Sequence, residues 1–271
     1  MSRKVITMTN LIPVEPVRPP AAYMGGKSRL AKQIITLINK TPHTGYADVF
    51  VGMGGIFFRR DLKPKTEVIN DFNGDVANLF RILEHHYGQF MDELKYKLTC
   101  REEFQRLIKL DPTALTDLQR AARFLYLQKT SFGGKVSGQS FGLNKDGDGR
   151  FNLLTLGPLL DDIYNRMSGV TIENLTWQDF VKRWDRDGML FYLDPPYWNC
   201  ENDYGKDMFS KADFTQMAKA LKGIRGTFIL SINDVPEIRQ IFKGFKQEPV
   251  SLKYSIAAGN STEAKELIIS G

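Results

Sequence analysis

The chain has 271 residues, of which 42% are hydrophobic and 25% are charged, which is the composition of a globular protein and excludes a collagen-like, coiled-coil or disordered chain. Its mean hydropathy is −0.30, and it contains no continuous apolar run of about 18 residues and no apolar leader, so we expect a cytoplasmic protein without a membrane-spanning helix. Two cysteines and three histidines are too few for a disulfide framework or a cysteine-rich zinc site, and we expect no metal.

The net charge of +6 is distributed unevenly along the chain. Residues 1–84 contain 12 basic and 7 acidic residues, and residues 118–150 contain 6 and 2, whereas residues 166–271 contain 14 of each. Basic segments beside a neutral half favour a nucleic-acid partner, although a solvated surface alone is the simpler explanation of such a pattern.

The elements before residue 85 predict an α/β domain. After an extended, proline-rich arm that ends near Pro20, apolar residues at helical spacing predict a helix over 27–40. The apolar run 46–51 predicts a buried strand that leads through a glycine turn into a helix. A second strand at 67–69 and a second helix at 75–84 complete a βαβ beginning.

Strand patterns are missing from about 85 to 168, where helical spacing prevails, notably over 115–128. We therefore expect a helical insertion over 85–168 between the two parts of the main domain, residues 1–84 and 169–271. The segment 144–149, with the sequence Asn-Lys-Asp-Gly-Asp-Gly, predicts the tip of a hairpin carried by the insertion.

Beyond the insertion the alternation of strands and helices resumes. Continuous apolar runs such as Phe191 to Leu193 are typical of strands that are buried on both faces. With the two strands above, the remaining elements give a seven-stranded, mostly parallel sheet. The remaining strands are predicted over 170–173, 189–193, 227–232, 249–256 and 263–269, and the helices over 178–184, 211–221 and 237–242.

Two strand ends carry a candidate cofactor site, because ligands bind beyond the carboxyl ends of the strands in open α/β sheets. Gly52, Gly54 and Gly55 follow the first strand, where missing side chains let the backbone approach a ligand. Asn70 and Asp71 follow the next strand, and a carboxylate at this distance accepts hydrogen bonds from ribose hydroxyls. The pair predicts a nucleoside-containing cofactor, whereas the glycines alone fit a simple tight turn nearly as well.

The tetrapeptide Asp194-Pro195-Pro196-Tyr197 follows the strand 189–193. By themselves, consecutive prolines make a rigid turn. The segment also offers a carboxylate, two backbone carbonyls without an N–H from either proline, and an aromatic face. These groups suit a planar base with an amino group, which needs two acceptors and a ring to stack on.

These motifs, in this order, resemble those of the Dam-type DNA adenine methyltransferases over nearly the whole chain, from Tyr23 to Ser270. The resemblance rests on motifs for the cofactor, for catalysis and for target recognition. Residues 23–27 resemble the N-terminal cofactor motif, 50–55 the glycine-rich loop, 70–73 the ribose-binding turn, 177–180 the segment near the cofactor's adenine, 194–197 the catalytic motif, 230–234 and 266–268 later structural motifs, and 124–127 with 131–134 the target-recognition region.

The resemblance implies a Rossmann-like methyltransferase sheet with a helical target-recognition insertion. It also implies S-adenosylmethionine as the cofactor, S-adenosylhomocysteine as the product, double-stranded DNA as the partner, and a monomer. The implied catalytic residues are Asp194, Pro195, Pro196 and Tyr197. The implied cofactor-binding residues are Tyr23, Met24, Gly26, Lys27, Asp48, Phe50, Gly52, Gly54, Gly55, Asn70, Asp71, Asp179, Phe180 and Asp194. In the insertion we expect DNA contacts from Lys129, Phe132, Lys135, Lys145 and Arg150.

The implied reaction is methyl transfer to the N6 amino group of adenine. That nitrogen is a poor nucleophile because its lone pair is delocalised into the ring. Hydrogen bonds to the Asp194 carboxylate and the Pro195 carbonyl would localise the lone pair while Tyr197 stacks on the base, so positioning and electrostatics supply most of the rate. Because a base stacked in a duplex cannot reach such a corner, the adenine must be flipped out, at a cost of about a few kcal/mol.

The sequence departs from the family at several positions. Asp48 stands where many relatives have glutamate, and Gly55 where they have serine. The arginines with which relatives read bases are missing before Asn144 and at Tyr254, so these base contacts do not carry over, and the resemblance leaves open whether GATC is the target. Two alternatives stay open: the same chemistry on RNA or on a protein amide, and a DNA-binding relative without turnover. A restriction-modification pair, a mobile element and a housekeeping system all fit as the biological setting.

Overall fold

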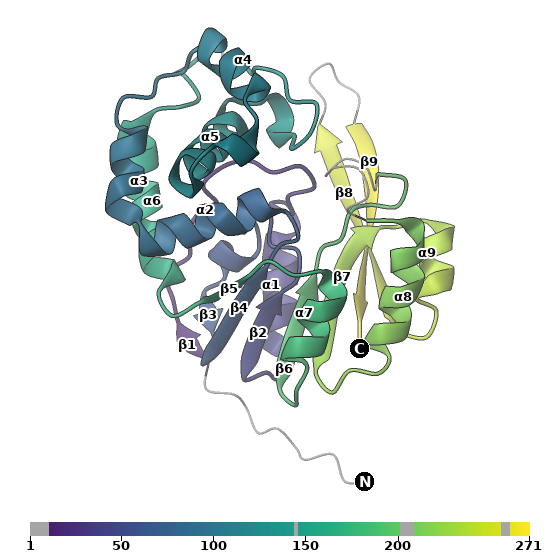
Figure 1. The fold of residues 1–271 in the computed structure, drawn as a ribbon. Coiled ribbons are helices and arrows are strands. Elements are labelled where there is room, and N and C mark those ends of the chain that lie inside the picture. The colour runs from purple at the N-terminus through teal and green to yellow at the C-terminus, as the bar shows by residue number, and fades with distance from the viewer. Residues whose placement is uncertain (1–10, 144–145, 201–208, 256–260) are drawn as a thin grey trace.

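The computed structural model describes residues 11–143, 146–200, 209–255 and 261–271 (Figure 1). Within them, seven strands form one sheet in the order β5-β4-β2-β6-β7-β9-β8. The first five of these run parallel, and β9 is antiparallel to both of its neighbours. The predicted seven-stranded, mostly parallel sheet is therefore confirmed. The strands are β2 (Gly45–Asp48), β4 (Thr66–Asn70), β5 (Thr171–Glu173), β6 (Met189–Leu193), β7 (Thr227–Asn233), β8 (Lys246–Ser255) and β9 (Ser261–Ser270).

Helices cover both faces of the sheet because its strands are apolar on both sides. Alternate residues of a strand point to opposite faces, so Tyr46 packs in the same cluster as the first two helices, and Ala47 packs with the last three. The central strand β6 is buried at every position, as its continuous apolar sequence predicts. The helices are α1 (Ala31–Lys40) and α2 (Gly74–His85) for the first cluster, and α7 (Trp177–Trp184), α8 (Lys211–Leu221) and α9 (Pro236–Ile241) for the second.

The insertion lies between α2 and β5, and Figure 1 shows its helices gathered to one side of the sheet. It contains α3 (Tyr87–Leu94), α4 (Arg101–Lys109), α5 (Asp117–Thr130) and α6 (Leu153–Met167), with short 3-10 helices η2 (Pro112–Ala114) and η3 (Phe132–Gly134). Its buried side chains belong to the same cluster as α1, α2 and one face of the sheet. The insertion and the sheet therefore share a continuous core.

The predicted hairpin of the insertion differs from what the structure shows. In the described part of 131–152 the only β pairing is an isolated bridge between Ser131 and Phe141, and residues 144–145 of the expected tip lie outside the described residues. Two backbone hydrogen bonds of 2.8 Å flank this bridge, from the Phe132 N–H to the Ser140 carbonyl and from the Gly142 N–H to the Thr130 carbonyl, and side chains add further contacts. Phe141 packs edge-on against Phe104, and the Arg150 guanidinium donates to the Ser131 carbonyl at 3.0 Å. The described part of the segment therefore contains one short antiparallel pairing and no longer strand ladder.

The N-terminal arm forms more structure than its prolines predict. Its first described residues form β1 (Ile12–Pro13), which pairs with β3 (Leu62–Lys63) just after the 3-10 helix η1 (Phe57–Arg59). The helix predicted from residue 27 begins only at Ala31, because a turn with a hydrogen bond from the Gly26 N–H to the Tyr23 carbonyl precedes it.

The arm then passes between the sheet and the insertion. The Met24 N–H donates to the Gly134 carbonyl at 2.9 Å, and the Gln128 amide donates to the Ala22 carbonyl at 3.1 Å. A Cβ on Gly134, whose φ is +66°, would lie 2.8 Å from the Ala22 carbonyl carbon. Glycine is needed at this crossing because the two backbones touch there.

A buried ion cluster joins the insertion to the sheet. Glu67 of β4 accepts hydrogen bonds from Arg60 at 2.6 Å and from Arg166 of α6 at 2.7 and 2.9 Å. The two guanidinium groups also lie on aromatic rings, Arg60 on Tyr46 at 3.7 Å and Arg166 on Phe57 at 4.3 Å. The cluster is almost fully buried, so both arginines depend on one carboxylate for compensation.

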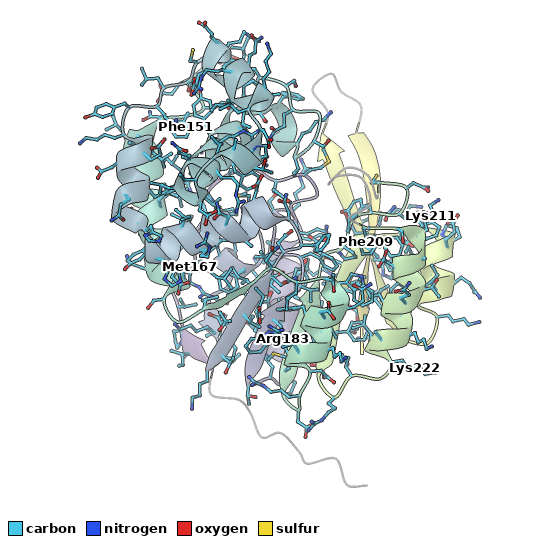
Figure 2. The ribbon with its side chains drawn as sticks, in the orientation of Figure 1. Phe151, Met167, Arg183, Phe209, Lys211 and Lys222 are labelled. Atoms are coloured by element: carbon cyan, nitrogen blue, oxygen red, sulfur yellow. The ribbon has the colours of Figure 1, made fainter. Side chains whose placement is uncertain are left out.

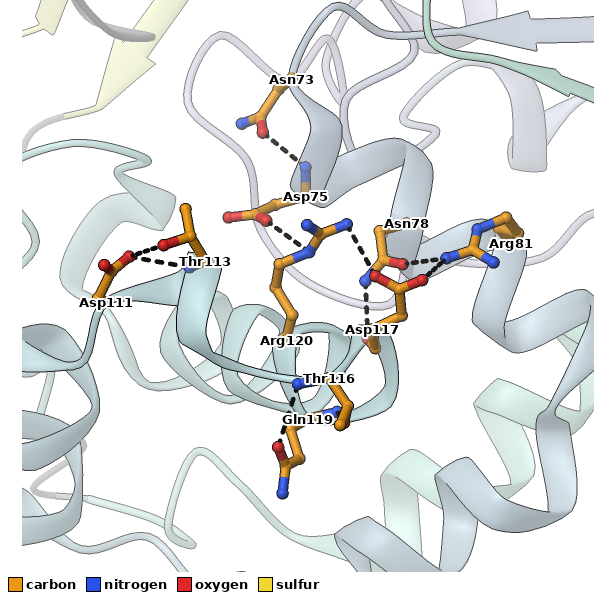
Figure 3. A network of polar contacts seen from close by, with 10 residues as sticks. All are labelled: Asn73, Asp75, Asn78, Arg81, Asp111, Thr113, Thr116, Asp117, Gln119 and Arg120. Carbon is orange, nitrogen blue, oxygen red and sulfur yellow. Dashed lines mark hydrogen bonds and ion pairs between the residues drawn. The ribbon is translucent and has the colours of Figure 1, made fainter.

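A more exposed polar network links α2 to the beginning of α5 (Figure 3). Asn78 donates to the Asp117 carbonyl at 2.8 Å, and Arg81 pairs with the Asp117 carboxylate. Arg120 lies between Asp117 and Asp75, 3.4 Å from each carboxylate. Because water reaches these side chains, we expect each pair to contribute little on its own.

Candidate active site

A cavity of about 710 Å³ lies at the carboxyl ends of β2, β4 and β6. The loops after these strands form one wall, arm residues 18–28 form another, and α5 and α6 complete it. Its volume is in the range of sites that hold cofactors. The cavity therefore lies where an open α/β sheet is expected to bind its ligand.

Most of the predicted site residues line this cavity. They come from the arm, the glycine turn, the ends of β2, β4 and β6, and α5, which the fold brings together from distant parts of the chain. The predicted residues that line it are Tyr23, Met24, Gly26, Lys27, Asp48, Phe50, Gly52, Gly55, Asp71, Lys129, Asp194 and Pro196.

Gly54, Asn70, Asp179 and Phe180 do not line the cavity. The Asn70 amide donates to the Val49 carbonyl at 3.0 Å and so links β4 to β2. Phe180 of α7 is buried in the core. The Asp179 carboxylate accepts a hydrogen bond of 2.8 Å from the hydroxyl of Thr176, the residue just before that helix. For these residues the structure shows contacts that hold the sheet and α7 in place.

The glycine turn brings backbone and carboxylate groups to the cavity. Gly52 has a φ of +51°, and a Cβ there would lie 2.8 Å from the Tyr23 ring, so only glycine fits. The Gly52 N–H donates to Asp71 Oδ2 at 2.8 Å, and Asp71 Oδ1 accepts from the Asn73 N–H at 2.9 Å. Burial raises the pKa of Asp71 to about 6, an effect these two hydrogen bonds oppose. The turn and the carboxylate thus hold each other in position.

Asp48, at the end of β2, is a buried carboxyl group that forms no ion pair with the residues the structure describes, although the charge of Arg60 opposes the rise in its pKa. The Tyr46 hydroxyl donates to its Oδ2 at 3.2 Å, and its Oδ1 has no hydrogen-bond partner within the described residues. Burial, together with the nearby negative charge of Asp194, raises the pKa of Asp48 to about 8. A buried carboxyl group with an unpartnered oxygen in a cavity wall is suited to receive a cationic ligand.

We expect Asp48 to make the folded protein less stable as the pH rises from 6 to 8. Its pKa is about 4 in an unfolded chain and about 8 here, so the folded state keeps a proton that the unfolded state has lost. Chemical denaturation should show wild type losing about 2 kcal/mol more than Asp48→Asn over this range. Asp71 acts in the same direction but chiefly below pH 6. Equal pH slopes for the two proteins would contradict the assignment.

Asp194, just after β6, has one oxygen fixed and one open. Its Oδ1 accepts from the buried Lys27 ammonium and from Ser231 Oγ at 3.3 Å, and Ser231 in turn shares a hydrogen bond of 2.8 Å with Tyr192. Burial raises the pKa of Asp194, and Lys27 opposes that shift. Oδ2 has no hydrogen-bond partner within the described residues, and the side chain is 18% exposed on the cavity wall. The carboxylate can therefore accept a hydrogen bond from a ligand.

Tyr197 is held at both its hydroxyl and its ring. The hydroxyl donates to the buried Glu266 of β9, and the Lys27 ammonium lies 4.5 Å from the ring centroid. Lys27 thus contacts both ends of the tetrapeptide, Asp194 and Tyr197. Pro196 lines the cavity. Pro195, which lies between Asp194 and Pro196 in the sequence, is buried.

Sequence reasoning missed several residues of this site. Phe209, just before α8 (Figure 2), lines the cavity and packs edge-on against Phe50 with ring centroids 6.0 Å apart. Arg18 and Arg59 add positive charge to the wall. An aromatic or basic residue in a loop carries no signal of the cavity it will face, since the contact depends on how distant loops come together. The other lining residues that were not predicted include Ser28, Asn73, Thr155, Leu156 and Leu159.

The predicted DNA-contacting residues are placed differently from one another. Phe132 is 63% exposed, and Lys135 is exposed near it, whereas Lys129 lies on the cavity wall. The Arg150 guanidinium is turned inward onto the Ser131 carbonyl. Lys145 lies outside the described residues.

The described residues contain neither a membrane-spanning helix nor a cluster of metal ligands. No helix in them is long and apolar enough to cross a membrane. No three histidine, cysteine, aspartate or glutamate side chains among these same residues gather as they would around a metal ion.

Comparison with known proteins identifies the family. The model of the D12 class N6 adenine-specific DNA methyltransferases matches residues 23–256. The type II methyltransferase M1.LlaDCHI of Lactococcus lactis subsp. cremoris is 25% identical over 93% of this chain and 95% of its own. M.CviBI of Paramecium bursaria Chlorella virus NC1A is 22% identical over 88% and 91%. A solved precorrin 8w decarboxylase of Methanobacterium thermoautotrophicum covers 96% of this chain and 99% of its own at 12% identity and a TM-score of 0.42, too low to bear on function.

The family match includes most of the residues that line the cavity, together with the glycine turn and the tetrapeptide that follows β6, and it covers well over half of the chain. Both relatives described above are type II methyltransferases. This chain belongs to the D12 class of N6 adenine-specific DNA methyltransferases, a family of S-adenosylmethionine-dependent enzymes.

Proposed function

We propose that this protein transfers a methyl group from S-adenosylmethionine to N6 of an adenine flipped out of double-stranded DNA, at a specific site, and that it does so as a monomer. The observation that carries the proposal is the Asp194 carboxylate. Lys27 and Ser231 fix one of its oxygens, and the other is open to the cavity that the family's cofactor and base would share.

The cavity residues fit S-adenosylmethionine. The unpartnered buried oxygen of Asp48 suits the ammonium group of the methionyl tail, and the Asp71 carboxylate suits the ribose hydroxyls. Gly52 lets the backbone approach without a side chain in the way. Asp48 stands in place of the family's glutamate, and a bound ammonium group would lower the pKa that burial has raised and so favour the charged carboxylate. Bound S-adenosylmethionine supplies an electrophilic methyl carbon on a positively charged sulfur.

The chain's own residues orient and activate the amine. Asp194 Oδ2 and the Pro195 carbonyl accept its two N–H groups, which localises the nitrogen lone pair toward the methyl carbon. Lys27 favours the ionised form of Asp194, because its charge opposes the effect of burial on the pKa. The Tyr197 ring stacks on the base. As the nitrogen–carbon bond forms and the carbon–sulfur bond breaks, the amine sheds one proton, for which Asp194 is the acceptor already in contact.

The insertion supplies the DNA-binding surface in this proposal. Residues 85–168 form the target-recognition part, and residues 1–84 and 169–271 form the catalytic part. Exposed Phe132 and Lys135 suit a base and a phosphate respectively, while Lys129 lies where a flipped nucleotide enters the cavity.

Transfer of tritium from labelled S-adenosylmethionine to unmethylated DNA tests the proposal. We expect label in N6-methyladenine after hydrolysis of the DNA, and none in RNA or in protein incubated in parallel. A folded protein that binds the cofactor but labels no DNA would overturn the proposal. Where DNA is labelled, sequencing the modified bases gives the recognised site.

We expect Lys135→Ala to weaken DNA binding and to make it less dependent on salt. Loss of one phosphate contact reduces the slope of log affinity against log salt by about 1. Lys222→Ala is the matched control, because Lys222 is an exposed lysine at the far end of α8 (Figure 2). Fluorescence anisotropy at several salt concentrations measures both slopes. An unchanged slope for Lys135→Ala would place the DNA elsewhere.

A further inference from the structure

One pair of facing residues in the β7–β9 ladder holds the segment that follows the Pro-Pro corner. Asn233, the last residue of β7, is paired with Glu266 of β9. Side chains of directly paired residues project from the same face of a sheet, with Cβ atoms about 4.5–5.5 Å apart. Here both reach one segment: Glu266 accepts the Tyr197 hydroxyl, while Asn233 accepts from the Trp198 N–H at 2.9 Å and donates to the Trp198 carbonyl at 3.3 Å.

The pairing depends on the direction of β9. Because β9 is antiparallel to β7, a residue in its middle faces the end of β7 and so reaches the edge where the parallel strands end. Tyr197 and Trp198 follow the end of β6, the neighbour of β7 on its other side. The sheet thus places the side chains of Glu266 and Asn233 within hydrogen-bond distance of Tyr197 and Trp198.

Burying the Glu266 carboxylate at this position of β9 costs folding free energy. Glu266 is 2% exposed, its Oε2 has no hydrogen-bond partner within the described residues, and the two residues that follow it, Leu267 and Ile268, are buried and apolar. Burial raises the pKa of Glu266, while Lys27 and the Tyr197 hydroxyl oppose that rise. An apolar residue would suit this position better if packing were its only task.

We infer that Glu266 and Asn233 are positioning residues of the methyl-transfer site. Glu266 anchors the far end of the Tyr197 ring and so fixes the plane on which the base stacks, and Asn233 fixes the backbone that follows. The Lys27 ammonium lies over the same ring, so a tilt of the ring also shifts the cation that holds Asp194. The inference rests on the proposed function, since it assigns the ring to a bound adenine.

The test compares single-turnover methyl transfer to unmethylated genomic DNA by wild type, Glu266→Ala, Tyr197→Phe and the double variant. Misplacement of a reacting group by about 1 Å costs up to about 100-fold, so we expect each single variant to be about 10- to 100-fold slower. Because both changes remove the same contact, the double variant should be no slower than the slower single one. The affinity for S-adenosylhomocysteine, measured by calorimetry, should stay within about twofold throughout.

Two further variants serve as controls, one for activity and one for folding. Glu248→Gln removes an exposed carboxylate from the neighbouring strand β8 and should transfer methyl groups at the wild-type rate. Tyr197→Phe combined with Glu266→Leu replaces the polar pair by an apolar one, so it should fold even where a lone polar partner does not. We expect it to melt like wild type and to be as slow as Tyr197→Phe.

Several outcomes overturn the inference while leaving the proposed function intact. These are single variants within about twofold of wild type, losses that multiply in the double variant, or cofactor affinity that falls in parallel with the rate. If wild type itself transfers no methyl group, the proposed function fails first, and this inference fails with it.

Discussion

Replacing Asp194 with alanine should lower the rate of methyl transfer by at least about 100-fold while the affinity for the cofactor changes by less than about fivefold. Oδ2 of this carboxylate is the open acceptor on the cavity wall, so its loss leaves the amino group of adenine without the contact that localises its lone pair. Asp48 and Asp71 remain to hold the cofactor. Single-turnover kinetics and calorimetry with S-adenosylhomocysteine measure the two quantities separately.

The Asp194→Ala variant needs a control, because it leaves the buried Lys27 ammonium without its ion-pair partner. Lys27 is 5% exposed and loses its counter-ion, which destabilises the fold on its own account. The double variant Lys27→Met and Asp194→Ala removes both charges and should regain stability without regaining transfer. Asp162→Ala, an exposed aspartate on α6, should behave as wild type. Equal losses of rate and of cofactor affinity in Asp194→Ala would show that this carboxylate serves the cofactor instead.

Replacing Glu67 with alanine should lower the free energy of unfolding by about 3–5 kcal/mol. The change leaves Arg60 and Arg166 buried, adjacent and without a counter-charge, although each keeps its aromatic contact. Arg166 belongs to α6, so the loss should also loosen the insertion from the sheet. Urea denaturation followed by circular dichroism measures the effect.

The exposed network between α2 and α5 supplies the matched control (Figure 3). Asp117 also pairs with two arginines, Arg81 and Arg120, but its side chain is 53% exposed. Asp117→Asn should therefore cost no more than about 1 kcal/mol. Similar losses for Glu67→Ala and Asp117→Asn would show that burial does not decide the strength of these ion pairs.

The elements that the sequence predicts well are those with strong local patterns. The strand 189–193 and the helix 211–221 have the predicted bounds, because a fully apolar run and a regular apolar stripe each permit one structure. The turn signal at 144–149 is equally local, but side-chain contacts of Phe141 and Arg150 decide the conformation of its surroundings. Local chemistry predicts a turn and leaves open what the turn connects.

The candidate site was predictable where a motif places residues at a strand end, and not where pairing is long-range. Asp48, Asp71 and Asp194 line the cavity as their positions after strands predict. Nothing in the sequence pairs Lys27 with Asp194, which is 167 residues away, or Tyr197 with Glu266. Such contacts depend on strand order and register. Asn70, also at a strand end, uses its amide to link strands, which its sequence context does not distinguish from ligand binding.

The continuous core shared by the insertion and the sheet bears on how an adenine could be unstacked from the DNA. If the enzyme flips its adenine as proposed, an insertion that shares a core with the sheet would not move as a separate domain, and we expect bending and twisting of the DNA to supply much of the unstacking. Adenines beside weakly stacked pyrimidine–purine steps are the least costly to extract. We therefore expect the mechanics of the double helix, alongside base contacts, to decide which adenines are modified fastest.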